Sequence, residues 1–78
     1  MRLYQMFNGF STSLLEEEPI IEAKNGAEAC KKLLEKLGIK YTKIIRSKSN
    51  SVKIRATPIK YDNGLKYLDG LPSWFEIY

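Results

Sequence analysis

Histidine is absent from this chain of 78 residues, and Cys30 is its single cysteine. The usual ligands of zinc, iron–sulfur clusters and haem are therefore missing, and so is the ordinary general base at neutral pH. One cysteine also excludes an internal disulfide. We predict a protein that is not an enzyme and holds no metal and no cofactor.

Long apolar runs are absent as well. No stretch approaches the roughly 20 apolar residues that cross a bilayer, and the N-terminal segment lacks the apolar core of a signal peptide. The five glycines are scattered singly, so no phosphate-binding glycine loop is formed. These absences predict a cytoplasmic protein with no membrane partner and no small-molecule substrate.

The residues that are present indicate one folded domain over positions 1–78. Apolar residues make up 44% and charged residues 28% of the chain, which is typical of globular rather than disordered proteins. A chain of this length has room for one hydrophobic core and not for two.

The segment 26–37 has the signals of an amphipathic helix. Asn25 is a favourable N-cap, Glu28 follows three residues later, and Gly38 supplies a left-handed end. Glu28 and Lys32 have the spacing of a helical ion pair. The apolar stripe predicted to face the core consists of Ala27, Cys30, Leu33, Leu34 and Leu37.

The remainder is predicted as strand and turn. Strands are expected at 2–10, 19–24, 39–46, 51–57 and 73–78, with a tight turn at 62–64. The stretch 11–18 fits either one helical turn or a wide loop. The fold class is therefore α+β in two layers, with one helix on a mostly antiparallel or mixed sheet in the order β-β-α-β-β-β. A β-grasp-like arrangement and a meander both fit this order.

Positive charge is concentrated in residues 40–60, which hold seven basic residues and no acidic one, whereas the rest of the chain has six basic and nine acidic residues. If 39–46 and 51–57 pair as a hairpin, Arg55 and Thr57 face solvent. Several cations then cluster on one surface, which is the arrangement needed to contact the phosphates of a nucleic acid. These cations are Lys43, Arg46, Lys48, Lys53 and Arg55. The competing interpretation is a solvated face whose lysines protect a sheet edge.

Aromatic residues are concentrated near the C-terminus. In the last strand Phe75 and Ile77 are expected inside, and Trp74 and Tyr78 are expected on the opposite face, where Trp and Tyr commonly anchor interfaces. Tyr41 and Tyr61 are further candidate contacts.

These features predict a small non-enzymatic interaction module that binds a protein partner or a second copy of itself. The alternative is a nucleic-acid-binding domain. In size and charge the chain resembles small accessory proteins of bacterial mobile elements and phages.

Overall fold

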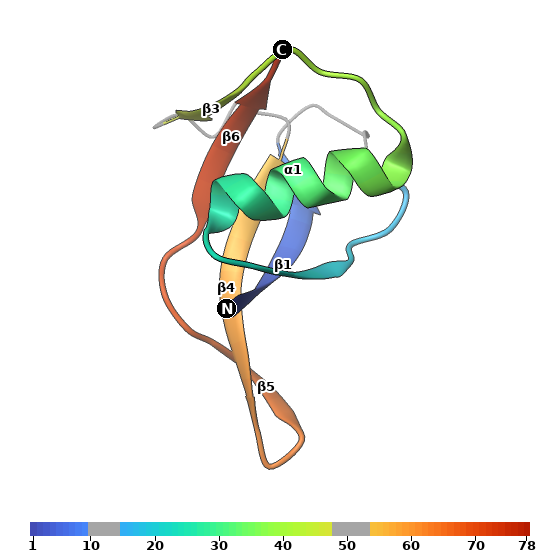
Figure 1. The fold of residues 1–78 in the computed structure, drawn as a ribbon. Coiled ribbons are helices and arrows are strands. Elements are labelled where there is room, and N and C mark those ends of the chain that lie inside the picture. The colour runs from blue at the N-terminus through green and yellow to red at the C-terminus, as the bar shows by residue number, and fades with distance from the viewer. Residues whose placement is uncertain (10–14, 48–53) are drawn as a thin grey trace.

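In the described part of the chain, one helix lies across one face of a six-stranded sheet (Figure 1). The computed structural model describes residues 1–9, 15–47 and 54–78. The elements are β1 (Arg2–Asn8), β2 (Ile20–Ala23), α1 (Gly26–Leu37), β3 (Ile44–Ser47), β4 (Ile54–Asp62), β5 (Leu65–Leu68) and β6 (Ser73–Ile77). The predicted two-layer α+β fold and the predicted order of its elements are confirmed.

The sheet has the order β2-β1-β4-β6-β3, and β5 pairs with β4. Every pairing between the described strands is antiparallel. The expected hairpin between 39–46 and 51–57 is wrong, because β6 lies between β3 and β4. In this position β6 places Phe75 and Ile77, which are 3% and 6% exposed, in the core beneath α1.

The bounds of α1 are those predicted from its capping residues. The Asn25 side chain accepts a hydrogen bond from the Glu28 amide at 2.9 Å. Gly38 closes the last turn with φ of 72°, a conformation that favours glycine. The expected pair of Glu28 and Lys32 is present at 3.4 Å.

The buried stripe of α1 differs from the prediction at both ends. Ala27 is exposed and Leu37 is 47% exposed, whereas Ala29 is buried. The reason lies at Gly26, where an added Cβ would be 3.0 Å from the Phe75 ring. This close approach of the first turn to the sheet directs Ala27 outward. The buried helix residues are Gly26, Ala29, Cys30, Leu33 and Leu34.

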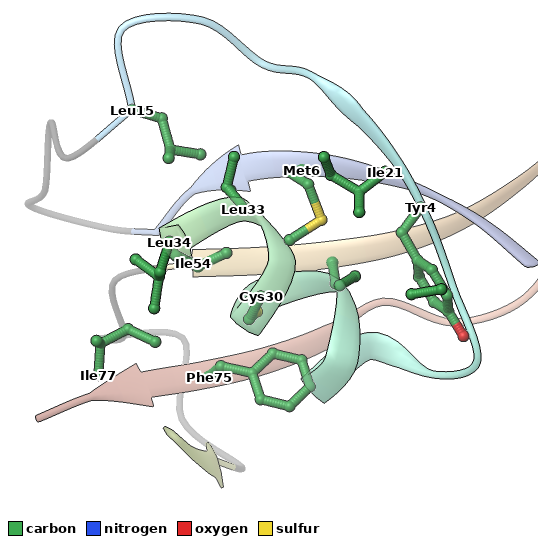
Figure 2. Close-up of a cluster of buried hydrophobic side chains, with 13 residues drawn as sticks. Tyr4, Met6, Leu15, Ile21, Cys30, Leu33, Leu34, Ile54, Phe75 and Ile77 are labelled. Carbon is green, nitrogen blue, oxygen red and sulfur yellow. The ribbon is translucent and has the colours of Figure 1, made fainter. Parts of the chain in front are cut away.

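The core lies between α1 and the sheet (Figure 2). Met6, Leu33 and Ile54 are fully buried there, and burying each such side chain contributes about 1.5–3 kcal/mol. Leu15 covers one end of this core. Asn8 holds Leu15 with two hydrogen bonds of 2.8 Å, one to its carbonyl oxygen and one from its amide. The described part of 11–18 forms no helix.

The strand β4 continues past the predicted end at 57 and leaves the two-layer body. Its last residues pair only with β5, through a turn in which Asn63 and Gly64 have φ of 52° and 78°. Positive φ at both turn residues is the geometry that suits a tight hairpin, so the predicted turn is confirmed. We refer to residues 60–72, which project beyond α1 in Figure 1, as the hairpin arm.

Candidate interaction face

The face of the sheet opposite α1, here called the outer face, is covered by no helix of the described chain (Figure 1). Directly opposed residues of antiparallel strands share a face. Phe7 lies opposite Arg55, and Arg55 opposite Trp74. Because the neighbouring Phe75 is buried toward α1, these three side chains point outward. The predicted alternation of Trp74 and Phe75 is confirmed.

Arg55 is held between two aromatic rings in what we call the Phe7–Arg55–Trp74 cluster. Its guanidinium carbon is 4.2 Å from the centroid of Phe7 and 5.4 Å from that of Trp74. Both distances fall within the range of cation–π attraction. The Arg55 Nε is buried without a hydrogen-bond partner, and neither ion pair among the described residues includes Arg55. The structure therefore places an uncompensated, partly desolvated cation on this face.

A second cation lies toward the β3 side of the same face. The Tyr78 hydroxyl donates a 2.6 Å hydrogen bond to Glu76, and Lys43 Nζ lies 5.4 Å from the Tyr78 ring centroid. The bond to the Glu76 carboxylate raises the pKa of Tyr78. Tyr78 is 57% exposed, so its ring is available for contact as the sequence predicted.

The other half of the outer face is not open to solvent, which corrects the expectation that Thr57 is solvated. Gln5 and Thr57 are each 6% exposed, and Ile59 is 4% exposed. Lys66, on β5, donates a 3.0 Å hydrogen bond to Gln5 Oε1 across the intervening β4. The hairpin arm therefore curls toward this half of the face, and the open half is the one around Arg55.

The remaining predicted contact residues are not brought together. Tyr41 packs against the core beside α1, whereas Tyr61 is 52% exposed on the hairpin arm. Arg46 lies opposite Phe75, hence on the helix side of β3. The predicted cationic cluster is thus divided between two faces, and its other members, Lys48 and Lys53, lie outside the described residues.

Two residues of this face were missed from the sequence, Phe7 and Lys66. The alternation along 2–10 could have placed Phe7 on the face of the strand away from Met6. It could not reveal that Arg55 would be the cross-strand neighbour of Phe7. Lys66 gave no signal, because its partner Gln5 is distant in the sequence.

A hollow of about 540 Å³ adjoins Trp74, lined by Arg46, Ser47, Pro72, Ser73 and Trp74.

No protein-family model, curated protein or solved structure matches this chain. Within residues 1–9, 15–47 and 54–78, no group of three or more His, Cys, Asp or Glu side chains is arranged so that it could hold a metal ion. The helix of this part of the chain is neither long nor apolar enough to cross a membrane.

Proposed function

We propose that this chain is a non-enzymatic interaction module whose outer face binds an acidic surface of another protein. One observation carries the proposal: the Arg55 guanidinium is fixed between Phe7 and Trp74 and forms no ion pair with a carboxylate of the described residues. A carboxylate from a partner would supply the acceptor that the chain itself does not provide.

The geometry suits such a partner for two reasons. The two rings hold the guanidinium in place, so little side-chain freedom is lost when a carboxylate binds its planar fork. Trp74 is half-buried beside it, and Trp and Arg are both among the residue types enriched at the energetic centre of protein interfaces. Lys43 and the net charge of +4 would speed the approach of an acidic surface.

The alternative proposal is nucleic-acid binding through Lys43, Arg46, Lys48, Lys53 and Arg55. The run of basic residues in 40–60 supports it. One observation makes it the weaker proposal. Arg46 lies on the helix side of β3, so the predicted cations are divided between two faces of the sheet. A phosphate chain that followed the outer face would not meet Arg46.

A cytoplasmic location belongs to the same proposal. A reducing compartment would keep the single thiol of Cys30 in its free form.

The test is an NMR titration of the native chain with two probes, an acidic peptide that alternates Glu with Leu and a single-stranded oligonucleotide. We expect the peptide to shift the Trp74 indole and Arg55 Nε resonances. Peptide shifts confined to the helix side would overturn the proposal. If the oligonucleotide binds instead, with a log–log salt slope of about −3 to −5, the alternative holds.

Arg55→Met is the decisive variant, with Arg46→Met as its matched control on the other face. We expect Arg55→Met to abolish the peptide shifts and Arg46→Met to retain them. Methionine fills the slot between the rings and removes an unpaired buried N–H, so the free energy of unfolding should stay equal or rise by about 1 kcal/mol. Lost binding in a fully folded variant would separate function from stability.

A further inference from the structure

The hairpin arm exposes more apolar side chains than any other part of the described structure. The described structure has ten exposed large apolar residues, and five of these ten lie on the hairpin arm, within residues 60–72. They are Tyr61 (52%), Leu65 (60%), Tyr67 (44%), Leu68 (74%) and Leu71 (88%). By register Tyr61 and Leu68 lie on the outer face and Leu65 and Tyr67 on the helix side, so the arm exposes apolar side chains on both faces. Exposed apolar side chains gathered in one short segment are typical of an interaction surface.

The arm is fastened to the body. At its base Arg2 Nη2 donates to the Asp69 carbonyl at 2.8 Å, and the Asp69 amide donates to the Pro58 carbonyl at 2.9 Å. On its outer side Lys66 is bonded to Gln5 at 3.0 Å. A partner of the arm would therefore meet a surface that is already ordered, which lowers the entropic cost of binding.

The free edge of β5 is open to another strand. Asp62 and Leu65 flank a two-residue turn and form its hydrogen-bonded pair, so the backbone groups of Lys66 and Leu68 point away from β4. A lysine on an edge strand commonly blocks pairing, but the Lys66 side chain is turned onto Gln5. The edge strand β2 differs, because Lys32 Nζ donates to its Glu22 carbonyl at 2.8 Å.

The charge of the arm favours a second copy over an acidic or a nucleic-acid partner. Residues 60–72 contain two lysines and two aspartates, so the arm is neutral, and the net charge of +4 lies elsewhere in the chain. An acidic partner gains little attraction here. Two arms, by contrast, meet without repulsion while the cationic bodies stay at opposite ends.

We infer that two copies of this chain pair through β5, antiparallel about a two-fold axis at Tyr67. With the two-fold axis perpendicular to the sheet, the outer faces of the two copies lie on the same side of the joined sheet. The residue at the axis must then lie directly opposite the same residue of the second copy. Centring on Tyr67 places Lys66 opposite Leu68 of the second copy, and both residues have outward backbone groups. Centring on Lys66 would place two ammonium groups together.

This surface is separate from the Phe7–Arg55–Trp74 cluster, so a test that contradicts the dimer leaves the proposed function unaffected, and the reverse also holds. The contact uses one edge of a short hairpin and belongs to the small end of specific interfaces, below about 1,200 Å² in total. We therefore expect a dimer that dissociates on dilution.

Disulfide trapping tests the register. With Tyr67→Cys the two Cα atoms would be about 4.5 Å apart, within disulfide reach. Leu65→Cys is on the same face, but in this register residue 65 faces residue 69 of the second copy. The two cysteines would therefore be about 13 Å apart along the strand direction, beyond disulfide reach. We expect a covalent dimer from Tyr67→Cys and none from Leu65→Cys. Equal trapping of both variants, or of neither, would overturn the register. The buried Cys30 does not interfere, because burial raises its pKa to about 12.

Sedimentation velocity of the native chain tests the association itself. We expect its mean mass to rise toward that of a dimer with concentration. Leu68→Lys places a cation opposite Lys66 of the second copy and should keep the chain monomeric. Leu37→Lys makes the same change at an exposed leucine of α1 and should leave the dimer intact. A native chain that is monomeric even near millimolar concentration, or equal loss in both variants, would contradict the inference.

Discussion

The strand β4 passes through two environments, and the contrast between them explains most of this molecule. From Ile54 to Ile59 it is flanked by β1 and lies partly against β6, and its core-facing residues are covered by α1. From Lys60 to Asp62 its one neighbour in the described structure is β5, and every residue is exposed. Strand pairing thus extends the sheet, but cover from other elements, α1 on one face and the hairpin arm on part of the other, decides which side chains are buried.

Truncating one leucine in each environment should give the largest difference. We expect Leu33→Ala, in the covered core, to lower the free energy of unfolding by about 2–5 kcal/mol. Leu65→Ala, on the hairpin arm, should change it by no more than about 0.5 kcal/mol. Urea denaturation at a concentration where the chain is monomeric measures both values. Similar losses would show that the arm belongs to the cooperative core.

The bond that joins the two environments should have an intermediate effect. Lys66→Met removes the donor to Gln5 and leaves a buried carbonyl oxygen unsatisfied, at a cost of about 1–2 kcal/mol. Lys60→Met, on the opposite face of β4, is the matched control and should cost no more than about 0.5 kcal/mol. Hydrogen exchange should also become faster along β5 in Lys66→Met. Unchanged exchange would mean that this bond does not hold the arm.

The smallest effect concerns the thiol on the covered side. Burial raises the pKa of Cys30 to about 12, from an ordinary value of 9.0. Above pH 9 the unfolded chain releases the thiol proton and the folded chain retains it, so stability falls as the pH rises from 9 toward 12. The slope is at most about 1.4 kcal/mol per pH unit. Comparing unfolding of the native chain with Cys30→Ala at pH 8 and pH 10 isolates this contribution. An equal difference at both values would contradict it.

The local parts of the fold were predictable from the sequence because local residues determine them. Asn25, Glu28 and Gly38 set both ends of α1, and the turn at Asn63 and Gly64 follows from two residues that tolerate positive φ. The burial of Ala29 was missed, because the rotation of the helix depends on how closely Gly26 approaches Phe75. That contact joins distant segments, and no periodicity within the helix reveals it.

The candidate site was predictable only in part, for the same reason. Alternation along 73–78 places Trp74 outward, and the structure agrees. Which residues lie beside Arg55 depends on how the strands pair. A hairpin between 39–46 and 51–57, which are adjacent in the sequence, was the simplest expectation. The insertion of β6 between β3 and β4 removes Arg46 from the face and brings Trp74 to Arg55 instead.

The central pairing of β1 with β4 also has a consequence for how the chain is made. Residues 3–8 meet residues 54–59, so β1 leaves the ribosome well before its main neighbour has been synthesised. Until then Tyr4 and Met6 have no finished sheet in which to be buried. Contacts between such distant segments slow folding and leave apolar strands open to aggregation. During synthesis, β1 is therefore the segment on which a nascent-chain chaperone would act first.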